Sequence, residues 1–141
     1  MSRLPAPTPP VNDETAPFWA ALGEGRLDLP VCDACGHHIW YPRSWCPVCQ
    51  HDQVTWTPLS GRGSVYARTI LHKATGPWSE AAPFVIAYVE LEEGPRVLTN
   101  VVTDDPSTVD VGTPVEAIFV PVDDSKEWSS ATHLLRFTPA G

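Results

Sequence analysis

Residues 32–49 read CDACGHHIWYPRSWCPVC and contain all four cysteines of the chain. The cysteines form two close pairs, Cys32 with Cys35 and Cys46 with Cys49, and ten residues separate the pairs. Two residues between ligands allow one tight turn to direct both sulfur atoms to a common point. A second turn of this kind, returned by a short hairpin, places four thiolates around one Zn²⁺ ion. The spacing therefore predicts structural zinc bound by Cys32, Cys35, Cys46 and Cys49.

Two other uses of the cysteines fit the sequence less well. A pair of disulfides requires an oxidising compartment, and residues 1–7 lack the apolar stretch of a signal peptide. A redox Cys-x-x-Cys motif usually occurs once, beside a βαβ pattern that this chain lacks. His37, His38 and His51 lie near the cysteines, but four thiolates already complete a zinc site, so we expect these histidines not to be ligands.

The residue after each cysteine pair also bears on this prediction. Gly36 follows the first pair, and a glycine there can take the positive φ that closes the turn. Gln50 stands at the equivalent place after the second pair.

Charge and composition restrict the partners of the chain. The 141 residues carry a formal net charge of −8, with 9 basic against 17 acidic side chains, and they show no basic cluster. Nucleic-acid binding depends on neutralised phosphates, so we expect no nucleic-acid partner although zinc ribbons and small barrels often have one. No apolar run approaches the roughly 20 residues that span a bilayer. We therefore expect no membrane partner and a cytoplasmic location.

The chain divides into four predicted parts. Residues 1–13 form a flexible, proline-rich arm, and residues 14–28 form a short helix with Thr15 as its cap and Pro17 in its first turn. Phe18 and Trp19 on so short a helix must be buried against the rest of the chain or against a partner. Residues 29–55 form the zinc ribbon, and residues 56–141 form a barrel.

The barrel prediction rests on five short apolar segments separated by turn residues. The chain is expected to be mainly β, with a five-stranded OB-fold barrel and an SH3-like barrel as its main competitor. The segment 84–91 is almost wholly apolar and is expected to be buried on both faces. In the first segment we expect Val65, Ala67, Thr69 and Leu71 to share one side. The predicted strands are Ser64–His72, Phe84–Leu91, Arg96–Val102, Val115–Val122 and His133–Phe137.

The aromatic stretch of residues 39–45, between the cysteine pairs, has two interpretations. It forms a hairpin that packs on the metal site and barrel, or it offers an apolar face to another protein; both can hold together. Six tryptophans in the chain favour an interface.

No catalytic set is visible. The sequence contains no Gly-x-Ser-x-Gly elbow and no phosphate-binding glycine loop, and the acidic pairs 104–105 and 123–124 lie among turn residues. We therefore expect a binding or assembly subunit rather than a free-standing enzyme.

Taken together, several motifs resemble the DUF35 family, which combines a rubredoxin-like zinc ribbon with an acyl-CoA-associated OB-fold. Gln50 departs from the glycine usual in that family. The resemblance spans about residues 14–138 and rests on the motifs at 17–19, 25–27, 32–36, 42–43, 46–49, 61–63, 83–91 and 111–116.

The resemblance implies a thiolase-fold or lipid-transfer-protein-like partner that carries the chemistry. The expected function is a non-catalytic subunit of a carbon–carbon lyase, an aldolase that cleaves a β-hydroxyacyl-CoA in steroid side-chain degradation. The alternatives are a partner of an acyl-CoA acyltransferase or thiolase complex and a single-stranded nucleic-acid-binding module. Acyl-CoA is expected at the partner interface, with the candidate contacts Arg43, Arg62, Arg68, Lys73 and Arg96.

Overall fold

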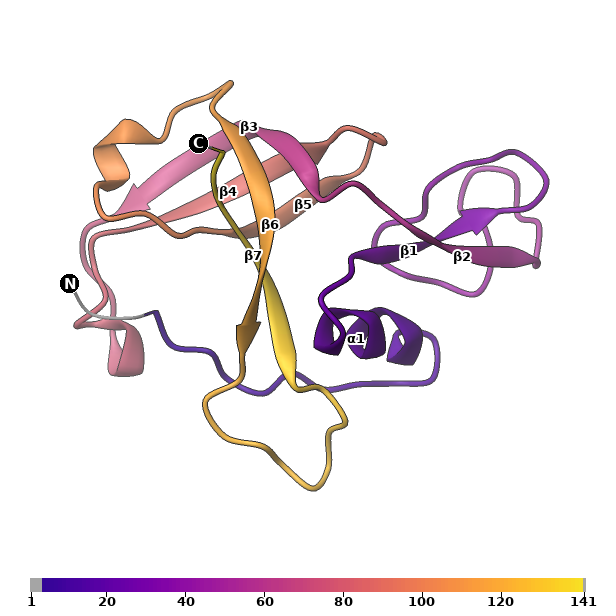
Figure 1. Ribbon diagram of the computed structural model, residues 1–141, viewed down its shortest axis with the longest axis horizontal. Coiled ribbons are helices and arrows are strands. Elements are labelled where there is room, and N and C mark those ends of the chain that lie inside the picture. The colour runs from indigo at the N-terminus through magenta and orange to yellow at the C-terminus, as the bar shows by residue number, and fades with distance from the viewer. Residues whose placement is uncertain (1–3, 141) are drawn as a thin grey trace.

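The computed structural model describes residues 4–140, and residues 1–3 of the predicted arm lie outside that range. Helix α1 comes first, a two-stranded ribbon follows, and a barrel completes the chain (Figure 1). The elements are α1 (Ala16–Gly23), β1 (Asp28–Cys32), β2 (Val54–Pro58), β3 (Arg62–Leu71), the 3₁₀ turn η1 (Gly76–Trp78), β4 (Phe84–Leu91), β5 (Arg96–Val101), the 3₁₀ turn η2 (Pro106–Thr108), β6 (Pro114–Pro121) and β7 (His133–Pro139).

The five strands β3 to β7 form a closed barrel in the order β3-β4-β5-β7-β6. All pairs are antiparallel except β5 with β7, which meet in parallel at Val101 and Phe137. A long connection from β5 to β6 places β7 between them, as in the Greek-key barrel of an OB-fold. The mainly β prediction with a five-stranded barrel is confirmed.

Two details of the predicted strands are wrong. A bulge between Val65 and Ala67 breaks the alternation of β3, so Thr69 is exposed rather than on the buried side. Strand β4 is not buried on both faces, because Tyr88 remains 46% exposed on the outer surface. The outer face of β3, β4 and β5 therefore carries exposed aromatic and apolar side chains.

Helix α1 is held by its apolar residues. Phe18 and Leu22 are buried in the same cluster as Leu29 of β1 and Phe137 of β7. Burying each large apolar side chain contributes about 1.5–3 kcal/mol. The helix therefore docks on the barrel, as its aromatic residues require.

The predicted cap of α1 takes a different form. Thr15 occupies the N-cap position, but its side chain makes no capping bond because its backbone is in the α region and its hydroxyl lies against Asn12. The N–H groups of Thr15 and Ala16 donate instead to the carbonyl of Asn12. At the other end, Gly25 has φ of 79° and closes the helix.

The described part of the N-terminal arm runs beside the barrel (Figure 1). The N–H of Ala6 donates to Asp123 Oδ2 over 2.8 Å, and the N–H of Asp123 donates to the carbonyl of Ala6 over 2.8 Å. Ala6 is fully buried, and Ser129 Oγ donates to the carbonyl of Pro9. These contacts attach the arm to the β6–β7 loop.

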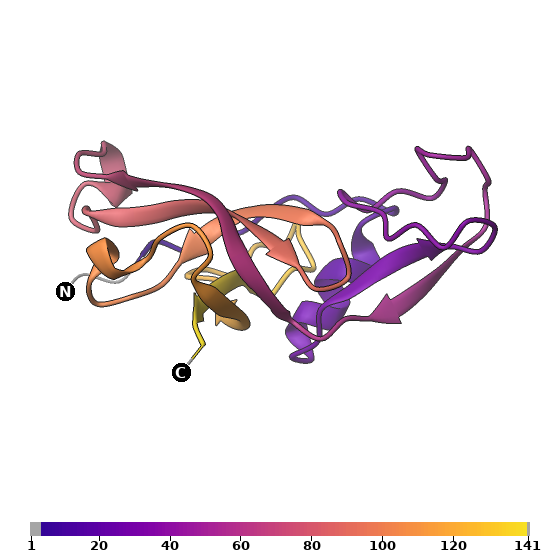
Figure 2. The same cartoon turned by 90° about the horizontal axis from the view of Figure 1, so that it is seen from above.

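The ribbon and the barrel lie end to end (Figure 2). Strands β1 and β2 pair antiparallel from Asp28 with Pro58 to Cys32 with Val54. Across residues 4–140, no helix combines the length and the apolar content needed to cross a bilayer.

Candidate metal centre and partner surface

The two cysteine turns have the same backbone construction. In the first turn the N–H of Gly36 donates to the carbonyl of Cys32 over 2.9 Å, and in the second the N–H of Gln50 donates to the carbonyl of Cys46 over 2.8 Å. Gly36 has φ of 76° and Gln50 has φ of 66°. Gln50 therefore adopts the left-handed conformation that glycine takes in the first turn, so the departure at position 50 leaves the turn intact.

The four sulfur atoms converge on one point. All four Sγ atoms lie within 4.8 Å of one another. The Cys32–Cys49 and Cys35–Cys46 sulfur distances are 3.5 and 3.7 Å. A zinc ion with Zn–S bonds of about 2.3 Å sets tetrahedral sulfurs about 3.8 Å apart, whereas a disulfide needs about 2.05 Å. The four cysteines are positioned to bind a metal ion, and the donor set fits zinc.

Backbone N–H groups lower the pKa of one thiol in each pair, Cys32 and Cys46, while the pKa values of Cys35 and Cys49 are raised. The N–H of Cys35 donates to Sγ of Cys32 over 3.5 Å, and the N–H of Val48 donates to Sγ of Cys46 over 3.4 Å. The Cys35 N–H is the main cause that lowers the pKa of Cys32 to about 6. Burial opposes the change at Cys46, but N–H groups of Cys49 and Val48 lower the pKa of that thiol too. Thiolates are the form that binds metal.

The three neighbouring histidines lie outside this sulfur cluster. Within the described chain, the grouping of metal-ligating atoms at this site contains the four cysteines alone. His37 and His51 take part through their backbone, since their carbonyls accept from the N–H groups of Cys32 and Cys46.

The aromatic stretch between the cysteine pairs divides into two halves. Ile39 is fully buried, and the ring of Trp40 packs 5.6 Å from that of Phe18. Tyr41, Trp45 and Val48 are 43%, 43% and 66% exposed. Both interpretations of the stretch therefore find support. We call the exposed apolar set Tyr41, Trp45 and Val48 the ribbon-tip surface.

The predicted cationic contacts are spread over the molecule. Arg62 begins β3 and Lys73 follows the end of that strand, so about 36 Å of extended chain separates the two. Arg43 is exposed in the ribbon loop. The structure does not gather the five residues into one basic site.

Three of these cations are paired with acidic groups of the chain. Arg68 donates to the carbonyl of Val109 and lies 3.7 Å from Asp110. Arg96 donates to Glu90 over 2.9 Å and stacks over the ring of Tyr66.

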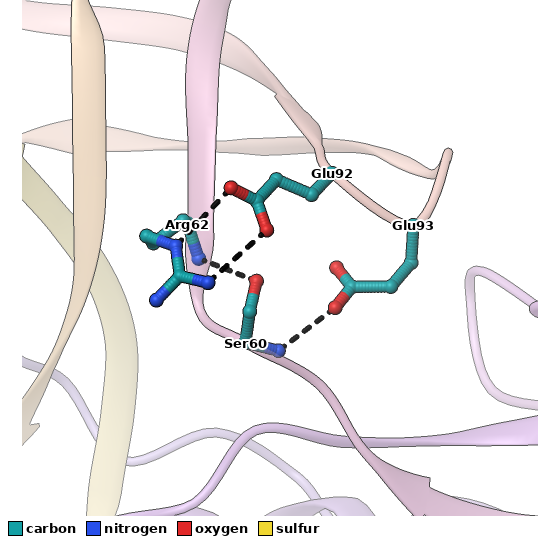
Figure 3. Close-up of polar contacts among 4 residues, drawn as sticks. All are labelled: Ser60, Arg62, Glu92 and Glu93. Atoms are coloured by element: carbon teal, nitrogen blue, oxygen red, sulfur yellow. Dashed lines mark hydrogen bonds and ion pairs between the residues drawn. The ribbon is translucent and has the colours of Figure 1, made fainter.

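Arg62 is paired at the junction of ribbon and barrel (Figure 3). Its guanidinium donates to both carboxylate oxygens of Glu92, and this bond lowers the pKa of Glu92. The N–H of Ser60 donates to Glu93, and the N–H of Arg62 donates to Ser60 Oγ. These bonds fix the chain where it enters the barrel, which gives Arg62 a structural role.

Sequence reasoning missed two features. The first is an apolar cavity of about 600 Å³ on the barrel, lined by segments 71–78, 84–86 and 98–100. The second is a bond between Glu14, just before α1, and Ser44 of the ribbon loop. No local motif marks either feature, because each joins segments distant in the sequence.

Two family models match the chain. The model described as ChsH2, rubredoxin-like zinc ribbon domain, covers residues 19–55, and the model described as ChsH2, C-terminal OB-fold domain, covers residues 56–120. The SH3-like alternative is thus set aside.

Similar proteins include scaffolds and enzyme subunits. A DUF35 domain-containing scaffold protein of Methanothermobacter thermautotrophicus is 31% identical over 128 residues, which cover 89% of this chain and 96% of the relative. The 3-oxo-4,17-pregnadiene-20-carboxyl-CoA hydratase alpha subunit of Mycobacterium tuberculosis is 33% identical over 122 residues; the match covers 86% of this chain but 37% of that subunit. A solved structure titled Ltp2-ChsH2(DUF35) aldolase has a TM-score of 0.76 at 30% identity and covers 93% of this chain and 98% of that chain.

Proposed function

This chain belongs to the DUF35 family of ChsH2-like proteins, and from this premise we propose that it is the non-catalytic subunit of a thiolase-fold acyl-CoA enzyme. The proposed reaction of the complex is aldol cleavage of a β-hydroxyacyl-CoA in steroid side-chain degradation. The similar chain in the Ltp2-ChsH2(DUF35) aldolase supports the aldolase, and the hydratase alpha subunit named for a pregnadiene acyl-CoA supports the steroid class.

The observation that carries the proposal is the ribbon-tip surface. Trp45 exposes large aromatic area, and Tyr41 is equally exposed although one side of its ring packs 6.2 Å from that of Phe18. Aromatic residues of this kind dominate the binding energy of protein interfaces, and a rigid loop loses little entropy on binding. The tip therefore suits docking on a partner enzyme.

Structural zinc fits this role. Held by Cys32, Cys35, Cys46 and Cys49, the ion would join both turns and so set the positions of the loop between them. Bound zinc would cross-link the two cysteine turns. Its four thiolate ligands would leave no open coordination position for a substrate. The chain's own contribution is the backbone N–H bonds that favour the thiolates of Cys32 and Cys46.

An acyl-CoA contact, if made by this subunit, belongs near the docking surface. Arg43 is exposed and stands two residues before Trp45. Arg62, Arg68 and Arg96 are engaged with carboxylates of the chain. Lys73 lines the barrel cavity at the end distant from the ribbon, so we assign the acyl-CoA contact to Arg43. Arg43→Met in the assembled complex is expected to raise KM for acyl-CoA with little change in kcat, whereas Lys126→Met, in the β6–β7 loop, serves as the control.

Co-expression with a thiolase-fold acyl-CoA enzyme from the same organism tests the assembly. The pair is expected to co-elute and to cleave a β-hydroxyacyl-CoA. Trp45→Ala is expected to weaken the complex about thirtyfold, because a central aromatic anchor contributes about 2 kcal/mol or more. Trp128→Ala, at a tryptophan 64% exposed on the β6–β7 loop, is the matched control.

Separate elution, or activity that ignores this chain, would contradict the proposal. Acyl transfer by the co-eluting pair without aldol cleavage would replace the aldolase by the acyltransferase alternative. Tight, steeply salt-dependent binding of single-stranded DNA would favour the nucleic-acid alternative instead.

A further inference from the structure

An apolar cavity of about 600 Å³ opens on the barrel at the end distant from the ribbon. Its walls come from the outer side of β4 and β5 and from the segment that follows β3. The aromatic and aliphatic lining includes Trp78, Phe84, Ile86 and Leu98. Cavities of this size and composition are typical of sites for small organic molecules.

The cavity is built on a packed base. Phe84 is 6% exposed and belongs to a small buried cluster with Leu4 and Ala81. The ring of Trp78 lies 5.2 Å from that of Phe84. Asn100, a polar residue of the lining, already donates its side-chain amide to the carbonyl of Val85 over 2.9 Å. The walls are therefore fixed before any ligand binds, and a ligand would contact mainly apolar side chains.

One charged residue lines this space. Among the described residues that line the cavity, Lys73 is the sole charged side chain, and within residues 4–140 no ion pair or hydrogen bond engages its ammonium. Arg62, Arg68 and Arg96 each pair with a carboxylate, in contrast to Lys73. A single unpaired cation beside an apolar surface complements an apolar molecule with one negative charge.

We propose that this cavity binds an elongated apolar monocarboxylate, with its hydrocarbon part against Trp78 and Phe84 and its carboxylate at Lys73. The net charge of −8 favours one negative charge over several, because one lysine neutralises a monoanion while the remaining surface repels a polyphosphate. The site therefore selects a free acid over its CoA thioester, and it needs no partner subunit.

Calorimetry on the full zinc-loaded chain at low ionic strength tests the site. Dodecanoate below its critical micelle concentration is the probe, with dodecan-1-ol and dodecanoyl-CoA as comparisons. Dodecanoate is expected to bind about tenfold more tightly than the alcohol, since a charge-assisted contact is added. The thioester is expected to bind more weakly than dodecanoate.

Two pairs of variants locate the binding. Lys73→Met keeps an apolar stem and removes the charge, so its affinity for dodecanoate is expected to fall to that of the alcohol, while Lys126→Met leaves affinity unchanged. Leu98 and Val111 are 57% and 65% exposed, and the latter does not line the cavity. Leu98→Asp is expected to abolish binding, and Val111→Asp is expected to have no effect.

Several results overturn the proposal. They are equal affinity for acid and alcohol, tighter binding of the thioester, no heat with dodecanoate, or the same loss in both members of a variant pair. Because these titrations use the chain without its partner enzyme, a failure here leaves the aldolase proposal standing. Failed co-elution with the enzyme likewise leaves this site standing.

Discussion

The ribbon tip and the barrel are built on different principles. The buried cluster of the tip contains three residues, Cys32, Ile39 and Cys46, with Val54 packed against it. The barrel shares one extensive apolar cluster with α1, and this cluster includes Phe18, Leu22, Val85, Val101 and Phe137. Hydrophobic burial suffices for the barrel, whereas a three-residue cluster cannot offset the conformational entropy of the tip. The tip therefore depends on its metal.

The boundary between the part held by apolar packing and the part held by the metal lies within the ribbon. Leu29 of β1 belongs to the barrel cluster, while Cys32 at the end of the same strand belongs to the tip cluster. Trp40 packs on Phe18 and reaches back to the barrel. One strand thus passes from a part held by apolar packing to a part held by metal ligands, and perturbations of the two parts are expected to separate.

The largest expected effect comes from removing a ligand. Cys49 is exposed, so Cys49→Ser leaves no cavity and is expected to be mild unless its sulfur binds metal. The zinc-linked folding energy of such sites is about 10 kcal/mol or more. We expect the variant to lose zinc by elemental analysis and the NMR signals of residues 33–52 to collapse while barrel signals persist.

The matched control for this variant is His51→Ser. It alters a side chain next to the second turn but keeps all four sulfurs and the backbone carbonyl that accepts from Cys46. This control is expected to retain zinc. Full zinc content and unchanged tip signals in Cys49→Ser would contradict the assignment of the metal centre.

The barrel is expected to be destabilised by substitution of a residue in its apolar core. Phe137 of β7 is fully buried in the barrel cluster. Phe137→Ala is expected to lower the free energy of unfolding by about 3–5 kcal/mol, because it removes apolar contacts and leaves a cavity. Urea unfolding measures the loss, and Val111→Ala, at an exposed position, is expected to change stability by less than about 0.5 kcal/mol. Equal effects of both variants would refute this account of the core.

A third prediction compares one glycine of each region. A Cβ at Gly63 would overlap the carbonyl oxygen of Glu90 on β4 and lie 2.9 Å from Cγ1 of Val89. Gly36 has φ of 76° but open space around it. Gly63→Ala is expected to destabilise the barrel by about 1–3 kcal/mol, through overpacking against backbone that cannot yield.

Gly36→Ala is expected to act on the ribbon tip alone. Its cost is about 1 kcal/mol, the strain of a left-handed backbone at a non-glycine residue. Hydrogen exchange measured residue by residue separates the two glycines, since each variant should accelerate exchange in its own region. Faster exchange throughout the barrel in Gly36→Ala would show that the tip and barrel unfold together.

The sequence predicted those features of the ribbon and the barrel that depend on neighbouring residues in the chain. The cysteine spacing places four sulfurs because each turn is closed within a few residues, and the apolar segments 84–91 and 96–102 predicted β4 and β5 nearly to the residue. The sequence did not predict the bulge between Val65 and Ala67, because the pairing of β3 with β4 determines it and the composition of β3 does not. Local sequence patterns thus predicted the strands but not the irregularity within β3.

Contacts between segments that are distant in the sequence could not be predicted from local patterns. The cavity at Lys73 exists because the register of β4 with β5 places Ile86 opposite Asn100 beside the turn that contains Trp78. The attachment of Ala6 to Asp123 needs a partner 117 residues away. Proline content predicts that the arm is extended, but it carries no information about what lies alongside it.

The smallest expected effect concerns Glu14, a carboxylate that joins the start of α1 to the ribbon loop. Glu14 accepts from the N–H and the hydroxyl of Ser44, both over 2.8 Å. The Ser44 N–H is the main cause that lowers the pKa of Glu14 from 4.5. Because the folded pKa is below the unfolded value, this bond stabilises the fold above about pH 4.5, and its contribution disappears as the pH falls through the folded pKa.

The Ser44 amide shift measured by NMR against pH should report this titration, with a midpoint below 4.5. Glu14→Gln is expected to remove the titration and to lower the melting temperature slightly at pH 7, but not at a pH below the midpoint of that titration, where the wild-type carboxyl is neutral. Ser44→Ala, which removes the hydroxyl bond but keeps the N–H bond, is the control in a double-mutant cycle, since partners of one bond give non-additive effects. A difference in melting temperature that persists below this midpoint would place the effect of Glu14 elsewhere than in its charge.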